Sequence, residues 1–471
     1  MAGEAFALLE EKIRPGVFVR IVNTGSTGSV ALPRGIVGAI FRADWGPIGS
    51  AHELEAEGQI METYGDLAQT AVAREAFRGG ARRVVAVRLG AGGTKAVVEL
   101  DDGAAAAVAT VTAKYEGVRG NAFRFTVRTS LADATKREAI LYEGAQELER
   151  HTYTAGADEA AALETAWAES PYVVVDKLVV GDGTVANIAL APLATGTEPD
   201  VTGAALTNAL GLLEVEDINV LAVDVEDTTS HATVDAWVMT ARNNGRRVMA
   251  VVGEPTSVAI ATRRANATAL NNEAIVYVAN GFTTEEGNLE GYEAAARVAG
   301  MIASAPVTAS MTHAVVDGAT ALVGSLTGLE IEQAIGSGAL VFTRNAAREV
   351  QIEYGITTLV TPGLEQDDGW KKIRRVRTRD ELIAQIVADS DVLIGKVNND
   401  ATGRALLQAK MQGAVNRLIA AGALASGSVQ VDPGNAPAGD SAWFVVEVDD
   451  NDSVEKLYIT FGFRFAAPVA A

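Results

Sequence analysis

Three apolar segments in the middle of the chain decide the fold: INVLAV (residues 218–223), RVMAVV (247–252) and EAIVYV (273–278). Two segments with helical spacing of apolar residues separate them, at about residues 228–243 and 256–270. Strands that are apolar throughout and alternate with helices form parallel sheets, which helices cover on both faces. The sequence therefore predicts an α/β domain in this region.

We expect this α/β body to consist of two parts, residues 36–90 and residues 201–361. The first part contains a buried strand, two helices and a second strand, predicted at residues 35–40, 54–64, 67–78 and 83–88. The second part adds a helix at residues 290–303. A chain of 471 residues is too long for one hydrophobic core, so further domains are expected.

The segment between the two parts has a different sequence pattern. Residues 91–200 contain short segments with alternating apolar residues, which predict strands at 96–100, 109–115, 122–127, 138–142 and 172–180. A helix is expected at residues 158–169, and residues 184–201 are rich in Gly, Pro and Thr and indicate a linker. We therefore predict a mostly β insertion domain.

Residues 362–471 are predicted to form a small α+β domain. Helices are expected at residues 379–390 and 402–421. Two strands, residues 441–448 and 456–465, are expected to form a hairpin across the acidic turn at 449–452. The predicted fold class is thus an α/β and α+β multidomain protein, with residues 1–35 as an N-terminal arm and linker.

Both ends of the chain carry strand-like segments with apolar residues at every second position. Near the C-terminus, LYITFGFRF (residues 457–465) places Leu457, Ile459, Phe461, Phe463 and Phe465 on one face. Near the N-terminus, a short helix at residues 4–12 is expected before a strand that contains Val17, Phe18, Val19 and Ile21. A strand at the end of a chain pairs with its own sheet or with the sheet edge of another molecule.

The composition excludes several classes of function. The net charge of −21 disfavours nucleic acid and anionic membranes as direct partners. The absence of cysteine excludes disulfides, thiolate zinc sites and cysteine nucleophiles. We find no signal peptide pattern and no apolar run long enough for a membrane helix, so we expect synthesis in the cytoplasm.

No motif in the sequence assembles a catalytic, metal or cofactor site. The four histidines, at positions 52, 151, 231 and 313, lie far apart and without ligand spacing. The turn at residues 253–256 follows a strand and opens a predicted helix, but Glu254 would repel an anion such as phosphate. We therefore predict no catalytic residues, no metal and no cofactor.

Two basic features stand out against the acidic whole. Residues 371–379 carry six basic residues and are interpreted as a basic strand that contacts an acidic neighbour of the same kind. The helix at 402–421 has no acidic residue, and Lys410 and Arg417 lie seven positions apart on one face. That face is either a docking surface or a solvated basic stripe.

The chain resembles the tail sheath proteins of contractile-tailed phages and of related phage-tail-like bacteriocins. The resemblance spans essentially the whole chain and rests on the order and spacing of several short motifs. They are RPGVFV (14–19), RGIVG (34–38), WGP (45–47), TAKYEGVRGN (112–121), AAARVAGM (294–301), GKVNN (395–399) and the closing strand.

The resemblance implies a structural role. Sheath subunits stack as six-membered rings around a rigid inner tube, and their terminal arms add strands to a small sheet in the C-terminal domain of neighbours. That domain faces the tube, the inserted domain faces outward, and contraction drives the tube through the target envelope. The implied partners are further copies of the chain, the inner tube protein, and baseplate and tail terminator proteins, within a virion tail or a bacteriocin particle.

In this interpretation, Lys410 and Arg417 dock on an acidic tube surface and residues 23–29 act as a hinge. Three alternatives remain open from the sequence. The first is the sheath of another contractile injection system, such as type VI secretion. The second is an α/β enzyme that binds a nucleotide at residues 253–256, and the third is a surface-layer or capsid-like protein.

Overall fold

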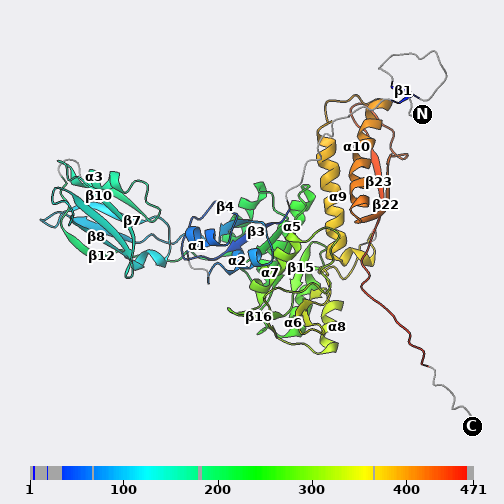
Figure 1. Cartoon of the computed structure of the whole chain (residues 1–471), viewed down its shortest axis with the longest axis horizontal. Coiled ribbons are helices and arrows are strands. Elements are labelled where there is room, and N and C mark those ends of the chain that lie inside the picture. The colour runs from blue at the N-terminus through cyan, green and yellow to red at the C-terminus, as the bar shows by residue number, and fades with distance from the viewer. Residues whose placement is uncertain are drawn as a thin grey trace, which may run out of the picture.

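The structure is a computed structural model that describes residues 4–5, 18–19, 34–65, 68–178, 183–363 and 366–463. It is elongated and has three units (Figure 1): a β-rich unit at one end, an α/β body in the middle, and a unit of two long helices and a hairpin at the other end. The body is formed by chain segments on both sides of the β-rich unit.

A seven-stranded sheet forms the centre of the body. Its strand order is β19-β15-β14-β13-β3-β5-β4, and every neighbouring pair is parallel except β4 with β5. The strands are β3 (Ile36–Phe41), β4 (Ala51–Leu54), β5 (Arg83–Arg88), β13 (Val220–Val223), β14 (Met249–Gly253), β15 (Ile275–Val278) and β19 (Ala339–Leu340). All six residues of β3 are buried, because helices cover both faces of the sheet.

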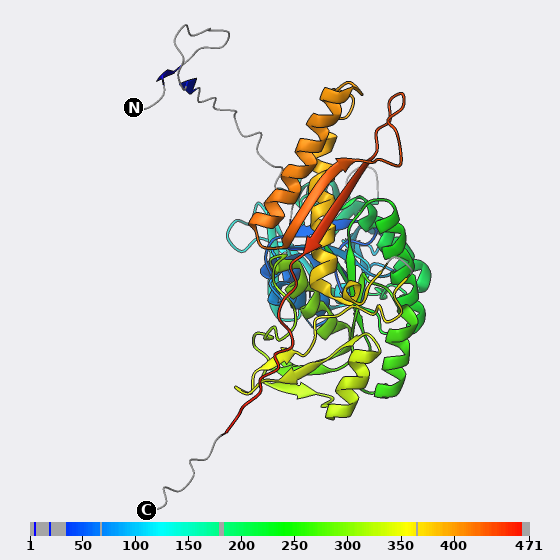
Figure 2. The ribbon, with the colours of Figure 1, turned by 90° about the vertical axis from the view of Figure 1, so that its right-hand side faces the viewer.

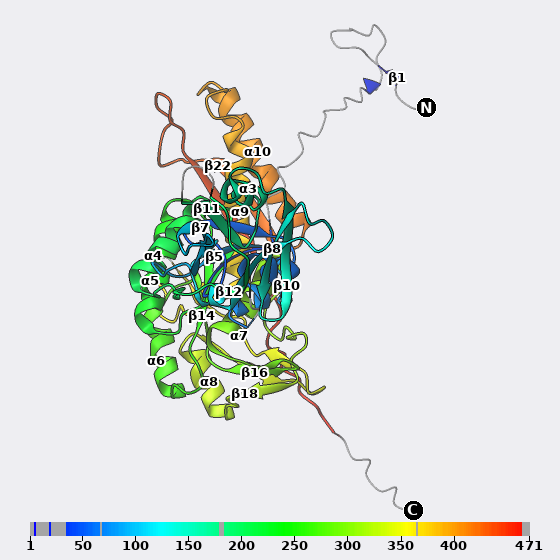
Figure 3. The same ribbon diagram turned by 90° about the vertical axis from the view of Figure 1, so that its left-hand side faces the viewer.

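Helices α2 and α7 pack together on one face, and α4, α5 and α6 lie in a row on the other (Figure 3). The helices of the body are α1 (Gly58–Tyr64), α2 (Ala71–Arg78), α4 (Gly203–Leu212), α5 (Thr228–Asn243), α6 (Ile260–Leu270), α7 (Gly291–Ser304) and α8 (Gly328–Gly336). The α2–α7 crossing is very close: a Cβ on Gly300 would lie 2.1 Å from the Ala76 carbonyl oxygen. Glycine is therefore required at position 300.

Two small sheets complete the body. One is three-stranded, with the order β17-β16-β18, and the other is the hairpin of β20 and β21. Their bounds are β16 (Gly281–Thr284), β17 (Gly287–Leu289), β18 (Ala321–Val323), β20 (Phe342–Arg344) and β21 (Val350–Ile352).

The β-rich unit is a sandwich of a four-stranded sheet, β10-β9-β8-β12, and a three-stranded sheet, β11-β7-β6. Its elements are β6 (Val97–Asp101), β7 (Ala107–Ala113), β8 (Phe123–Thr129), β9 (Arg137–Glu143), β10 (Gln146–Tyr153), α3 (Glu159–Ala166), β11 (Val173–Lys177) and β12 (Ile188–Pro192). Asp158 caps α3 by accepting a hydrogen bond from the Ala161 amide at 3.1 Å.

Side chains from the body close the junction with the sandwich. Trp45, from the loop after β3, is buried in the sandwich core. Arg88, at the end of β5, is also buried and donates to the carbonyls of Ala43, Gly46 and Glu116 at 2.8–2.9 Å. Burial lowers the pKa of Arg88. Gly117 has a φ of +137°, and a Cβ there would lie 2.5 Å from the Asp44 carbonyl oxygen.

The C-terminal unit contains α9 (Ile373–Asp391), α10 (Ala401–Ala420), and the antiparallel strands β22 (Leu424–Val431) and β23 (Phe444–Asp450). A short 3-10 turn, Asp368–Lys371, precedes α9. Near the other terminus, β1 (Glu4–Ala5) pairs in parallel with β2 (Phe18–Val19). No helix among the described residues is long and apolar enough to cross a membrane.

Several predictions about individual elements are wrong. Glu4 and Ala5 are extended, not the start of a helix. Leu54 ends a strand, and the helix predicted from that position begins at Gly58. The predicted linker at 184–201 contains β12, which pairs with β8. The basic run at 371–379 is mostly the first turns of α9 and not a strand.

The predicted closing hairpin is also wrong. The partner of β23 is β22, a segment for which no strand was predicted, and residues 456–463 pair with no strand in the described part of the chain. Phe465, Val17 and Ile21 lie outside the described residues. The C-terminal segment is instead extended and leads away from the body (Figure 2).

Candidate functional site

The C-terminal unit is built around α9 and α10, and the sequence marks both ends of α10. Asp400 caps α10 by accepting a hydrogen bond from the Gly403 amide at 2.8 Å. Gly422, with a φ of +77°, follows the end of α10 and turns the chain into β22. The hairpin then packs on the helices through a small separate core that contains Leu382, Val415 and Leu424.

The hairpin of β22 and β23 is a sheet of only two strands within the described residues. A sheet of this size is marginal by itself, and each outer edge offers unpaired main-chain groups. The inward side of β23 is only partly covered, because Phe444 and Val446 are half-buried and Val448 is exposed. The hairpin therefore has the features of a sheet that another strand can extend.

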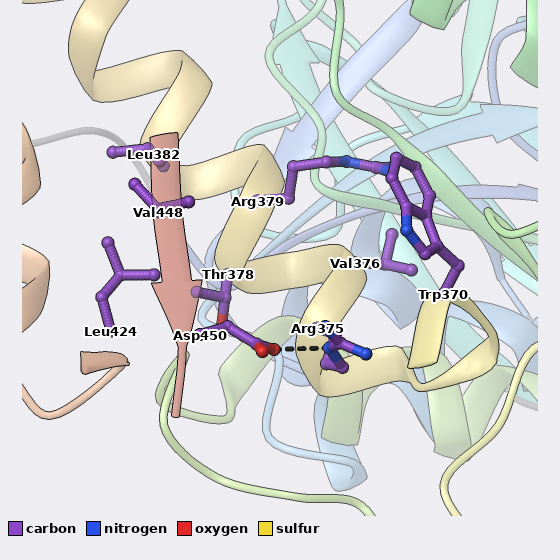
Figure 4. A pocket seen from close by; sticks show the side chains of 9 residues that line it. All are labelled: Trp370, Arg375, Val376, Thr378, Arg379, Leu382, Leu424, Val448 and Asp450. Atoms are coloured by element: carbon purple, nitrogen blue, oxygen red, sulfur yellow. Dashed lines mark hydrogen bonds and ion pairs between the residues drawn. The ribbon is translucent and has the colours of Figure 1, made fainter. Parts of the chain in front are cut away.

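A pocket of about 220 Å³ lies between β23 and the first turns of α9 (Figure 4). Apolar side chains from both elements line it, among them Val376, Leu382 and Val448. Trp370 forms one end, where the guanidinium of Arg379 stacks 4.3 Å from the centre of its ring. The pocket is thus an apolar hollow beside the hairpin.

The segment that follows β23 displays its apolar side chains to solvent. Phe461 is 74% exposed and Phe463 is 85% exposed, and Leu457 and Ile459 are exposed as well. Single exposed apolar residues are ordinary, but four at alternate positions of one extended segment are not. Such a segment indicates an interface that is completed by another surface.

Basic residues near the start of α9 hold the beginning of this segment. Arg375 Nε donates to Asp450 Oδ2 at 2.5 Å, and Lys372 Nζ contacts Asp452 and Glu455. The basic run thus does contact acidic residues, but within one chain and from α9 and the residue before it. Arg379 similarly pairs with Glu273 of the body, at 2.6 Å.

The two residues predicted to dock on a tube lie on one helix, as expected. Arg417 contacts Asp389 of α9, and its Nε donates to Gln385 Oε1 at 3.2 Å. Lys410 lies two turns earlier on α10 and is partly exposed. The charge of Arg417 is therefore partly neutralised by Asp389 of the same chain.

The turn at residues 253–256 is occupied by the protein's own carboxylates. The Thr256 amide donates to Glu290 Oε2 at 2.9 Å, and the hydroxyl of Thr256 contacts the same oxygen. Glu254 is buried and accepts hydrogen bonds from Asn266 and Tyr277. The following helix starts only at Ile260. This geometry opposes phosphate binding, so it argues against the nucleotide-binding alternative.

The histidines do not meet in one place. No group of three or more potential metal ligands occurs among the residues that the structure describes. His231 is buried beneath the sheet, and burial lowers its pKa. Its ring lies 6.2 Å from that of Tyr277, in an edge contact typical of a packed core.

Comparisons with known proteins identify the family. A family model described as the phage tail sheath protein central domain matches residues 200–358, and one described as the phage tail sheath protein beta-sandwich domain matches residues 91–200. Together they span more than half of the chain. The chain therefore belongs to the phage tail sheath protein family.

Individual similar proteins are phage-related. The phage-like element PBSX protein XkdK of Bacillus subtilis (strain 168) is 24% identical over 407 residues, which cover 84% of this chain and 83% of XkdK. The crystal structure of a sheath tail protein from Desulfitobacterium hafniense matches with a TM-score of 0.73 and 25% sequence identity. The match covers 92% of this chain and 100% of that chain.

A more distant structural likeness shows the fold alone. The helical sheath of the anti-feeding prophage in its contracted state has a TM-score of 0.54 at 13% identity, covering 96% of this chain and 99% of that chain.

Proposed function

We propose that this protein is the structural subunit of a contractile tail sheath, which polymerises as stacked six-membered rings around an inner tube. Contraction of the sheath drives the tube through a target cell envelope. The other partners are baseplate and tail terminator proteins of the same virion tail or bacteriocin particle, and no catalysis is involved. The observation that carries the proposal is the exposed, alternating segment 457–463 next to a two-stranded hairpin.

The chemistry of strand addition explains these two features together. The C-terminal segment of one copy adds to an edge of the β22–β23 hairpin of a neighbour, and main-chain hydrogen bonds hold it there. Its aromatic side chains cover the partly covered inward side of β23 and enter the pocket beside α9. The N-terminal strand around Phe18 and Val19 serves as the second exchanged strand.

Strand exchange also suits a sheath that changes shape. Main-chain pairing tethers neighbouring subunits while their bodies rotate as rigid units. The hinge predicted at residues 23–29 lies outside the described residues. Contraction then needs no nucleotide, because the extended lattice is held by kinetic barriers and the contracted lattice has the lower free energy.

Removing the apolar face of the C-terminal strand is expected to abolish polymerisation. Burial of Phe461 and Phe463 contributes about 3–6 kcal/mol per exchanged strand, at about 1.5–3 kcal/mol for each side chain. The double variant Phe461→Ser/Phe463→Ser should therefore raise the critical concentration for tube formation at least about a hundredfold. Negative-stain microscopy and sedimentation over a concentration series measure this.

The matched control places serines on the opposite face of the same segment, as Tyr458→Ser/Thr460→Ser. We expect this control to polymerise with a critical concentration within about tenfold of the unaltered protein, because solvent-facing positions contribute less burial. Thermal unfolding of dispersed subunits should be unchanged in both variants. Equal assembly by both variants would contradict the proposal, as would discrete small oligomers under all conditions.

The docking proposal for the tube is tested by charge reversal on α10. Lys410→Glu/Arg417→Glu is expected to block assembly around the tube, because both positions then repel an acidic tube surface. The control is Lys396→Glu, in the loop between α9 and α10. It reverses one charge in the same unit, away from the predicted docking face. Co-sedimentation of sheath with purified tube measures the effect.

Since Arg417 also contacts Asp389, the unfolding temperature of each variant is measured first. A folded double variant that assembles normal extended sheaths on the tube would remove Lys410 and Arg417 from the docking surface.

A further inference from the structure

The acidic residues that follow β23 do not form the turn that their sequence suggests. β23 ends at Asp450, and Asn451 then donates its amide to the carbonyl oxygen of Ala423 at 3.0 Å. From there the chain crosses toward the body and does not fold back along β23 (Figure 2). The contacts of residues 452–455 explain this course.

Lys372 is the centre of those contacts. Its ammonium group contacts Asp452 Oδ2 and lies 2.8 Å from Glu455 Oε2. Although burial works in the opposite direction, the contacts with the two carboxylates raise the pKa of Lys372. Arg374 adds a longer contact of 3.8 Å to Asp452. Two acidic side chains are thus held by one lysine.

Glu455 is also bound by the body. Its Oε1 accepts hydrogen bonds from the hydroxyls of Ser310 at 3.1 Å and Thr312 at 3.0 Å. Its side chain is only 10% exposed, whereas all the residues from 456 to 463 are exposed. Glu455 therefore marks the point at which the C-terminal segment leaves the protein surface.

The lysine itself is fixed by the backbone around it. Lys372 precedes the first residue of α9 and forms a β-bridge with Ile356 of the body. The Thr357 amide donates to the carbonyl oxygen of Lys371 at 2.7 Å. Hence residues 452–455 are attached to a junction where main-chain hydrogen bonds join the body to the start of α9.

We propose that Lys372 and Glu455 form an anchor that prevents the C-terminal strand from pairing with the hairpin of its own chain. The anchor thereby reserves that hairpin for the strand of a second copy. This inference rests on the proposed strand exchange, and it assigns Lys372 and Glu455 as positioning residues for it.

Mass action shows why such a device is needed. A strand tethered by a short flexible linker meets its own hairpin at an effective concentration in the millimolar range. Free subunits before assembly are far more dilute. If the linker were free, the C-terminal strand would therefore pair with its own hairpin in preference to that of another copy. Holding residues 452–455 on the body removes the turn that this closing needs.

Crosslinking can separate the two kinds of pairing, because the chain has no natural cysteine. Glu447→Cys labels the exposed side of β23, and Thr460→Cys labels the C-terminal strand. A double-cysteine chain treated with a flexible bismaleimide as a dilute monomer reports pairing within one chain. A mixture of the two single-cysteine chains under assembly conditions reports pairing between copies.

Loss of the anchor should increase pairing within the chain. In the Glu455→Gln background we expect the rate of internal crosslinking to rise at least tenfold and polymerisation to fall. Lys372→Met should have the same effect and a larger magnitude. Lys371→Met is the control, since among the described residues the ion pair of Lys371 is with the exposed Asp368 in its own turn. Glu455→Gln retains an oxygen that accepts from Ser310 and Thr312, so it keeps the test open if Lys372→Met does not fold.

The outcomes distinguish this inference from the proposed function. Suppose that the Glu455→Gln and Lys372→Met chains still crosslink between copies, and that their internal crosslinking stays at the level of Lys371→Met. This result would overturn the anchor and leave strand exchange intact. If chains with Lys372 and Glu455 unchanged polymerise but give no crosslink between copies, strand exchange is overturned, and the anchor with it.

Discussion

The variant Glu75→Leu is expected to lower the free energy of unfolding of the body by about 3–5 kcal/mol, because it leaves a buried guanidinium without its counter-ion. Arg297 Nη2 lies 2.6 Å from Glu75 Oε2, and the exposed fractions of the two side chains are 4% and 0%. Arginine cannot lose its proton to escape this penalty. Among the described residues, the other acceptor for Arg297 is the Asp317 carbonyl oxygen, at 2.7 Å.

The double variant Glu75→Leu/Arg297→Met is the matched control for this effect. It removes both charges and keeps side chains of similar size, so it should recover the stability lost at Arg297. The contacts of Glu75 with Arg74 and Arg78 stay lost in both variants. Glu286→Gln removes an exposed partner of Arg78 and should change stability by less than about 1 kcal/mol. Urea denaturation followed by circular dichroism measures all three. A single variant that is no less stable than the double variant would contradict the argument.

The centre of the fold could be predicted because its signals are local. The strands of the body are uniformly apolar, and the predicted helix at 228–243 coincides with α5, Thr228–Asn243. Strand β10 was missed because it is a mostly polar edge strand, with the sequence QELERHTY and only Tyr153 buried. Its place is set by pairing with β9, which no local pattern encodes.

The basic run at the start of α9 carried a signal that could have been used. Ile373 and Val376 are three positions apart and buried, which is helical spacing, and their basic neighbours obscured it. The ion pairs of this run with residues 450–455 could not be foreseen, since they depend on how distant segments meet. The error in the closing hairpin has the same origin, because those ion pairs occupy the acidic residues of the predicted turn.

The motifs at residues 45–47 and 112–121 acquire a physical meaning at the junction of body and sandwich. Trp45 packs edge-on against Tyr115 at 5.1 Å and Phe123 at 5.4 Å between ring centres. The guanidinium of Arg119 lies 5.3 Å from the centre of the Trp45 ring. A single side chain of the body thus completes the core of the sandwich, so the stability of the two units should be coupled.

Trp45→Ala tests this coupling and is expected to destabilise the sandwich by about 3–5 kcal/mol, the usual cost of removing a buried tryptophan. Loss of the ring also removes its aromatic and cation–π contacts, so the sandwich should unfold before the body and a single denaturation transition should become two. Trp443→Ala, at a partly exposed position in the C-terminal unit, is the control and should change monomer stability by less than about 1 kcal/mol. Denaturation followed by hydrogen exchange locates the unit that opens first. If the Trp45 variant keeps one transition at an unchanged midpoint, Trp45 does not couple the stability of the sandwich to that of the body. The sandwich is then stable without this side chain.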